Sequence, residues 1–287
     1  MVENSQIESS IAEIRKRNGK VTNFDKNKIT NAIHKALMAT NQDDRDLAEE
    51  LTNGVLDKLI TQGFSNSHPP SVEDIQDMVE STLIEQGHSE IAKSYILYRH
   101  ERRKIRDEKM TVLNTDNLDS VSKAFDLNCL RVLASRYLMR NNRNEITESP
   151  SQMFERVAIL IGIGDLLHDD EIFANNGNTQ QNIEEATEYL TKLDHFDYKF
   201  KIGEYYLNKW HFRGLINGYV DLAKKGQMKV GFKELLTQLA AKKFNIYSEK
   251  IDEYNSLMTN QIFLPNSPTM MNACLLYTSP SPRDATL

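Results

Sequence analysis

The sequence contains few cysteines and no long apolar run. Two cysteines, Cys129 and Cys274, cannot build a disulfide framework or a four-cysteine zinc site. The longest apolar run, 157–164, is far shorter than the about 20 residues that a membrane-spanning helix needs. Residues 1–6 have neither a basic nor an apolar stretch, so they do not resemble a secretory signal. We therefore expect a soluble, cytoplasmic protein with no membrane partner.

Neither sign of charge dominates. The chain has 35 Lys and Arg against 41 Asp and Glu, a net charge of −6. The overall field of such a chain does not attract nucleic acid, although a local basic patch can still bind phosphate groups. Hydrophobic residues make up 39% of the chain, which is enough for packed cores, and 287 residues suggest about two domains.

The first part of the chain has the pattern of a hairpin followed by helices. Asn18-Gly19 lies between two short strand-like stretches within residues 14–24, and both residues tolerate the positive φ of a tight primed turn. Four helical patterns follow, and their inward stripes begin at Ile29, Leu47, Ile75 and Ile91. We expect residues 1–11 to be a flexible tail and residues 12–106 to form one unit of a hairpin and about four helices.

The second part is largely helical in pattern. Residues 107–124 are polar without a sustained period, so we expect a linker there. Ser149, Pro150 and Gln152 form a capping box with proline at the first helical position. Further helical patterns cover residues 125–137, 184–193, 203–214, 232–244 and 248–258. Residues 263–273 contain two prolines and predict extended chain.

Residues 274–287 fit neither the helical pattern before them nor a strand. One back-translation of residues 274–284 reads as the transposase-end adapter used in short-read library preparation. An ordinary Pro/Ser-rich tail is the alternative. We expect a non-native, adapter-derived tail, with the natural sequence interrupted near Ala273, and we leave it out of the fold prediction.

Basic residues gather around the predicted turn and the start of the first helix. They are Lys16, Arg17, Lys20, Lys26 and Lys28. Cations beside the backbone N–H groups of a helix N-terminus are the ingredients of a phosphate site. A solvated basic turn explains the same residue types, so both interpretations stay open at this point.

Other candidate motifs carry little chemistry. Cys129 lies on an apolar helical pattern and is expected to be a small buried hydrophobe. The glycines Gly162 and Gly164 lack the third glycine and the preceding strand of a dinucleotide-binding loop. The seven histidines show no ligand spacing. We therefore expect no metal site in this chain.

Three blocks of the first unit together resemble the ATP-cone, the regulatory nucleotide-binding domain of many ribonucleotide reductase large chains. The blocks are residues 16–19, 24–29 and 92–99, and the resemblance extends over residues 12–106. It implies allosteric binding of ATP or dATP. Ser71 stands where many members have Thr, and Arg102 where a basic residue is usual. The implied nucleotide contacts are Lys16, Arg17, Val21, Thr22, Asn23, Phe24, Asp25, Lys26, Asn27, Lys28, Ser71 and Arg102.

The second unit resembles the helical N-terminal domain of the same large chains, through residues 127–138 and 148–158. Residues 263–273 resemble the first strand of the catalytic barrel, where Ser267 would help to bind substrate. The implied fold is mainly α: a small α+β ATP-cone, a helical reductase N-domain at 125–262, and the first strand of a truncated α/β barrel.

By this resemblance, the parent protein is a ribonucleoside-diphosphate reductase that makes 2′-deoxyribonucleotides by radical chemistry under ATP/dATP control. Residues 266–273 favour the adenosylcobalamin-dependent type. The family places its catalytic cysteines further downstream, so we assign no catalytic residue and expect this fragment to be inactive. The implied partners are ribonucleotide substrate, a thioredoxin-like reductant and further copies of the chain in a homo-oligomer, but no nucleic acid.

Two rival functions share the ATP-cone. A stand-alone ATP-cone regulator with a zinc ribbon would need Cys-x-x-Cys pairs before the cone, and the sequence has none. An anaerobic glycyl-radical reductase also carries ATP-cones, but residues 266–273 argue against that type.

Overall fold

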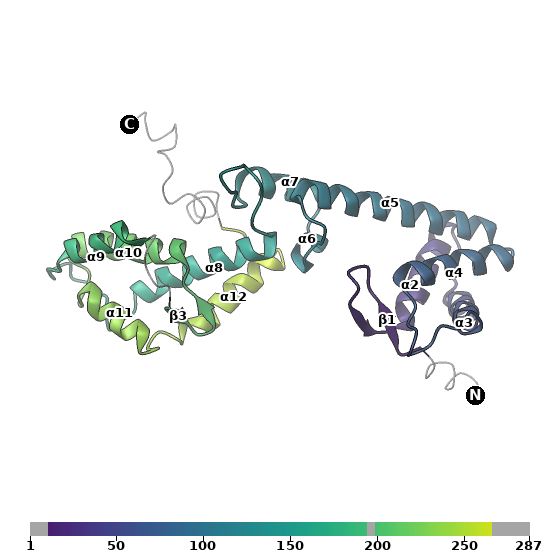
Figure 1. Cartoon of the computed structure of the whole chain (residues 1–287), viewed down its shortest axis with the longest axis horizontal. Coiled ribbons are helices and arrows are strands. Elements are labelled where there is room, and N and C mark those ends of the chain that lie inside the picture. The colour runs from purple at the N-terminus through teal and green to yellow at the C-terminus, as the bar shows by residue number, and fades with distance from the viewer. Residues whose placement is uncertain (1–10, 194–198, 266–287) are drawn as a thin grey trace. The chain divides into compact units, whose positions relative to one another are not determined.

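The computed structural model describes residues 11–193 and 199–265, and it divides the chain into two units at the bond between Glu108 and Lys109 (Figure 1). The described residues are mainly helical, with strands only in two small antiparallel hairpins, as the mainly α prediction requires. Most of the expected barrel strand, 263–273, lies outside the described residues, and so does the tail 274–287. Within the described ranges, no helix is long and apolar enough to cross a membrane.

The first unit begins with a hairpin of β1 (Glu13–Arg15) and β2 (Val21–Asn23), in which Ile14 lies opposite Thr22. The expected primed turn is wrong, because only Gly19 of the Asn-Gly pair has a positive φ, 79°. Gly19 donates its N–H to the Lys16 carbonyl, and Lys16 donates its own to the Lys20 carbonyl. The loop therefore has three residues and ends in a left-handed glycine, as in hairpin loops that close with a glycine bulge.

Four helices pack behind the hairpin. Cap residues next to the helices define where three of the four helices begin. Asp25 and Asp44 accept backbone N–H groups, and Ser71 forms a reciprocal capping box with Asp74. The predicted inward stripes form a single core, and Ile11, expected in the flexible tail, is buried in it. The helices are α2 (Lys26–Ala39), α3 (Arg45–Thr61), α4 (Val72–Glu85) and α5 (Ser89–Leu113).

The segment 107–124, where the sequence suggested a linker, contains the end of α5 and the whole of α6 (Ser120–Ala124). Helix α5 continues to Leu113, and α6 follows after a short connection. Lys109 of α5 is buried and donates hydrogen bonds from its ammonium group to the carbonyl oxygens of Ser122, Lys123 and Phe125. From the sequence, a lysine is expected to be exposed. Lys109 instead binds carbonyl groups at the C-terminal end of α6.

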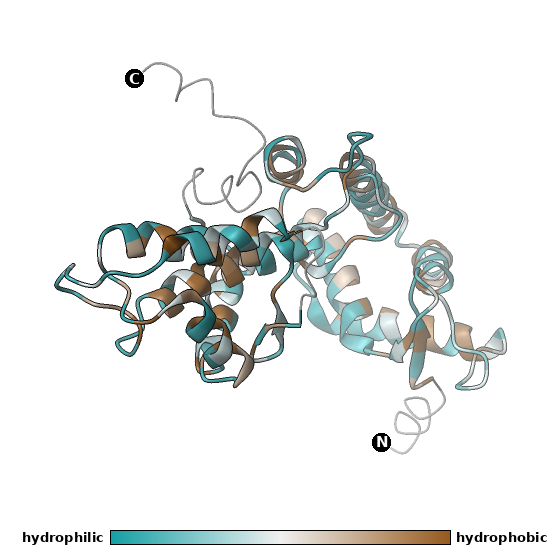
Figure 2. Ribbon diagram, turned by 60° about the vertical axis from the view of Figure 1, so that its left-hand side comes forward, coloured by the Kyte–Doolittle hydropathy of each residue, from teal (hydrophilic) through white to brown (hydrophobic). Residues whose placement is uncertain are grey.

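The second unit is built around α8 (Pro150–Leu167), which contacts α6, α10 and α12. Its Ser149 capping box forms as predicted. In Figure 2, apolar and polar residues alternate along the helices of this unit, as expected for helices buried on one face. The remaining elements are α7 (Leu127–Arg136), α9 (Ile183–Thr191), β3 (Lys201–Ile202), β4 (Tyr205–Tyr206), α10 (Lys209–Lys224), α11 (Phe232–Ala240) and α12 (Tyr247–Thr259).

The expected helix at 203–214 is wrong in its first half. Gly203 turns the chain between β3 and β4 with a φ of 58°, and α10 begins only at Lys209, after its cap Asn208. A Cβ atom at Gly203 would lie 2.4 Å from that of Ser248. The glycine is therefore required both by the backbone angle and by the approach of the α12 segment.

Candidate functional site

Backbone hydrogen bonds attach the hairpin to the start of α4. Arg15 donates its N–H to the carbonyl oxygen of Pro70 at 2.9 Å, and Arg15 and Ser71 form a parallel bridge. The Arg15 guanidinium also donates to the Pro69 carbonyl, at 3.3 Å. Two segments that are far apart in the sequence are therefore held side by side. Consequently, the turn that follows β1 lies close to the N-terminus of α4.

Arg17, in that turn, contacts the first turns of α4. Its Nε donates to Oε1 of Glu73 at 2.5 Å, and its Nη2 donates to Oε1 of Gln76 at 3.3 Å. The structure thus brings together Arg17 and the Ser71 helix start, two parts of the predicted nucleotide site. Lys16, the neighbouring predicted residue, is exposed in the same turn.

Arg106 of α5 adds a third element to this cluster. Its pKa is lowered by burial and then by the positive charges of Arg17 and Arg103, while Asp107 and Glu73 oppose this effect. Positive charge from the hairpin turn and from α5 therefore converges at the start of α4. We call Arg17, Arg103 and Arg106 the arginine cluster.

Arg106 was missed in the sequence-based site, although its spacing offered a signal. Arg99, Arg103 and Arg106 follow one another at helical spacing of four and three residues, so they share a face of α5. Arg102, which was predicted, is exposed, and its guanidinium lies over the ring of Tyr98 at 6.0 Å from the centroid. The structure therefore does not place Arg102 in the arginine cluster.

Arg99 joins α5 to α4. Its Nη1 donates to Asp77 at 2.8 Å and to Glu80 at 2.6 Å. Burial acts to lower the pKa of Arg99, but these two hydrogen bonds and charges outweigh it and raise the pKa above its usual value. Arg99 thereby fixes the face of α5 that carries Arg106.

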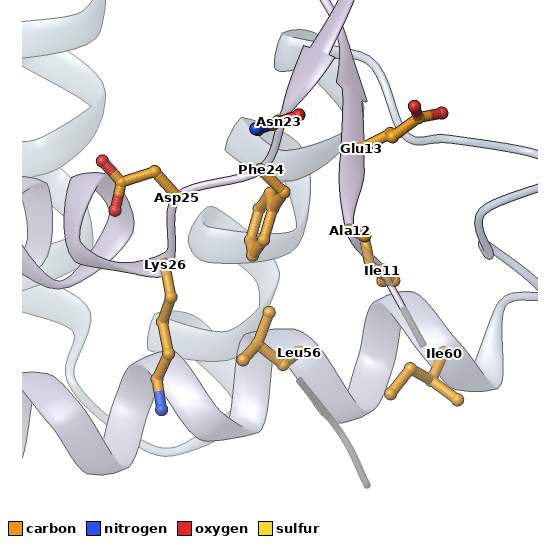
Figure 3. Close-up of a pocket in the computed structure, with 9 residues that line it drawn as sticks. All are labelled: Ile11, Ala12, Glu13, Asn23, Phe24, Asp25, Lys26, Leu56 and Ile60. Atoms are coloured by element: carbon orange, nitrogen blue, oxygen red, sulfur yellow. The ribbon is translucent and has the colours of Figure 1, made fainter. Parts of the chain in front are cut away.

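A pocket of about 550 Å³ lies at the other end of the hairpin, where β2 leads into α2. Figure 3 shows the Phe24 ring and the Lys26 side chain directed toward α3, whereas the Asp25 carboxylate points away from it. Asp25 accepts the N–H of Asn27 and so acts as the helix cap. The lining residues are Ile11, Ala12, Glu13, Asn23, Phe24, Asp25, Lys26, Leu56 and Ile60.

The predicted nucleotide contacts therefore fall into groups. Residues 23–26 line this pocket, whereas Lys16, Arg17 and Ser71 belong to the turn and the start of α4. Val21 and Thr22 lie in β2 between them, and Asn27 and Lys28 begin α2. The arginine cluster suits phosphate groups, whereas the pocket combines apolar lining residues with the Lys26 side chain.

Two further predictions concern the second unit. Ser267, the expected substrate contact, lies outside the described residues. Cys129 is half-buried and packs against the core, and burial followed by the charge of Asp126 raises the pKa of its thiol. A raised pKa disfavours the reactive thiolate, which agrees with the expectation of a packing residue.

The chain matches two known protein families and several known enzymes. The family model of the ATP cone domain matches residues 12–104, and that of the all-alpha domain of ribonucleotide reductase matches residues 123–199. The vitamin B12-dependent ribonucleoside-diphosphate reductase of Thermoplasma acidophilum is 34% identical over 268 residues, covering 92% of this chain and 31% of that protein. The enzyme of the same name from Mycobacterium tuberculosis is 31% identical over 147 residues, covering 51% of this chain and 20% of that protein.

An ATP cone followed by a reductase all-alpha domain is the domain order of a ribonucleotide reductase large chain. The chain belongs to the ribonucleotide reductase family and corresponds to the N-terminal region of its large subunits. The resemblance inferred from the motifs is thus confirmed. A stand-alone ATP-cone regulator does not account for the second match, which lies beyond the cone.

Proposed function

We propose that the first unit of this chain binds ATP or dATP as an allosteric effector. The observation that carries the proposal is the arginine cluster, in which Arg17 and Arg106 converge on the N-terminus of α4. Charge-assisted hydrogen bonds from guanidinium groups are well suited to phosphate oxygens. The match to the ATP cone domain supports a nucleotide as the ligand.

In this proposal, the phosphates lie at the hairpin turn. Lys16 and Arg17 contact them from the turn, Ser71 lies at the adjacent helix start, and Arg106 contacts them from α5. Arg102, one turn before Arg106, remains in the proposed set. The ribose and the base extend along β2 toward the start of α2, where residues 21–28 provide their contacts.

We propose further that the complete protein reduces ribonucleoside diphosphates by radical chemistry. Relatives of this chain are ribonucleoside-diphosphate reductases, which supports this activity. Adenosylcobalamin is the proposed radical source, because two of the relatives are B12-dependent enzymes. Among the residues that the structure describes, we propose no contact with adenosylcobalamin. Ribonucleotide substrate, a thioredoxin-like reductant, a homo-oligomeric state and a cytoplasmic location complete the proposal.

Calorimetric titration of the 287-residue chain with ATP and with dATP tests the effector site. We expect both to bind, and Lys16→Ala to weaken binding about tenfold or more, because a charge-assisted phosphate contact contributes about 1.5–3 kcal/mol. Lys35→Ala is the matched control, since Lys35 is exposed on α2, away from the turn. Absence of heat with both nucleotides, on a folded sample, contradicts the proposal.

A further inference from the structure

The guanidinium group of Arg17 already has an anionic partner within the chain. Glu73 accepts its Nε–H at 2.5 Å, and the two side chains are 42% and 46% exposed. Ion pairs at this exposure are weak and exchange readily, because water screens the charges. The pair therefore positions the Arg17 side chain, but Arg17 can leave Glu73 and bind another anion.

The position of Glu73 follows from local structure. It lies in the first turn of α4, two residues after the cap Ser71, where a carboxylate interacts favourably with the helix dipole. The bridge between Arg15 and Ser71 brings the hairpin turn to this point. Arg17 thus meets a carboxylate at the helix start where a phosphate is also favoured.

Glu73 also opposes the positive charge of the arginine cluster. Arg106 experiences repulsion from Arg17 and Arg103, and the carboxylates that counteract it are Asp107 and Glu73. A phosphate bound to Arg17 beside Glu73 would place two anions next to each other, and their repulsion is unfavourable. Because Glu73 is half exposed, its carboxylate can turn into solvent at little cost.

We infer that Glu73 competes with the nucleotide phosphates for Arg17 and so sets the affinity of the effector site. The inference rests on the proposed nucleotide-binding function and deepens it. Glu73 occupies Arg17 and leaves when a phosphate group takes its place. Part of the binding free energy is then used to break the Arg17–Glu73 pair, so effector affinity is lower than the arginine cluster alone would allow.

The test is calorimetric titration of the full chain with ATP, comparing wild type with Glu73→Gln. We expect the variant to bind ATP about twofold to fivefold more tightly, because it removes the competing charge at nearly constant side-chain size. Glu49→Gln is the control. It removes one carboxylate from the exposed Arg45–Glu49 pair on α3, where the two side chains are 50% and 58% exposed.

Equal or weaker ATP binding by Glu73→Gln overturns the inference, and so does an equal gain in Glu49→Gln, which would indicate a general charge effect. Glu73→Ala gives a second measurement with the same expected direction if the glutamine variant does not fold. Failure of the wild-type chain to bind ATP contradicts the proposed function itself. Wild-type binding without a gain in the Glu73 variants contradicts only the role of Glu73.

Discussion

Arg156 and Glu148 form a two-pronged ion pair inside the second unit. Nε of Arg156 donates to Oε1 of Glu148 at 2.7 Å and Nη2 donates to Oε2 at 2.9 Å, with only 4% and 8% of the side chains exposed. Glu148 also accepts the N–H of Met139, and Arg156 donates to the carbonyl oxygen of Tyr137. The pair therefore fastens the segment between α7 and α8 onto α8.

Removing one member of this pair should be strongly destabilising. We expect Glu148→Ala to lower the free energy of unfolding by about 3–5 kcal/mol, because it leaves a buried guanidinium without its carboxylate. Urea denaturation followed by circular dichroism measures the change. Lys192→Ala, which breaks the exposed Glu188–Lys192 pair, is the control and should leave the unfolding midpoint nearly unchanged. Similar midpoints for the two variants would contradict the prediction.

The two glycines of α8 should respond in opposite ways to alanine. A Cβ at Gly162 would lie 2.5 Å from Cγ1 of the buried Ile251 on α12, whereas a Cβ at Gly164 meets nothing within 4 Å. Alanine is the better helix former at both positions, but only Gly162→Ala must overpack the contact with α12. We expect Gly164→Ala to be more stable than Gly162→Ala by about 1–3 kcal/mol. Thermal and urea unfolding of both variants decide the order.

His211 should make the stability of the second unit pH-dependent. Burial lowers the pKa of His211 from 6.5 to about 4. Its Nδ1 accepts the N–H of Asn208, so a second proton on the ring would have to displace this capping hydrogen bond. A lowered histidine pKa means that the unfolded chain binds a proton first as the pH falls. The contribution of His211 to stability is therefore intact above pH 6.5 and is lost as the pH falls toward 4.

Between pH 7 and pH 5, this titration should cost about 2 kcal/mol of the free energy of unfolding. Urea denaturation of wild type and His211→Gln at both pH values isolates the contribution of His211, since every other titratable residue is the same in both proteins. We expect the loss on acidification to be smaller in the variant by that amount. An equal loss in both proteins would mean that His211 keeps an ordinary pKa.

The 287-residue chain should show no reductase activity, even with adenosylcobalamin and a dithiol. It spans 31% of the length of the Thermoplasma acidophilum relative, and by resemblance the catalytic cysteines lie downstream. Binding energy alone cannot replace missing reacting groups. An assay for deoxyribonucleotide formation, compared with a boiled sample, checks this expectation, and any product above that background would refute it.

The sequence predicted most of the helices because their signals are local. Asp25, Ser71 and Ser149 mark helix starts within three residues of the groups that they cap. The pairs Arg17–Glu73 and Glu148–Arg156 were missed, because charged side chains carry no signal of a distant partner until the fold brings them together. The β3–β4 hairpin was missed because its strands have two residues each, which is too short for an alternating pattern.

The anchoring of Lys109 has a consequence for chemical labelling. Its ammonium group is surrounded by the carbonyl oxygens of α6 and Phe125, whereas Lys104 and Lys123 are exposed on either side of it in the sequence. An amine-reactive reagent needs an accessible, deprotonated nitrogen, so Lys109 should react last of the three. Its labelling rate then reports the opening of the junction between α5 and α6, and mass spectrometry can follow that opening without any added probe group.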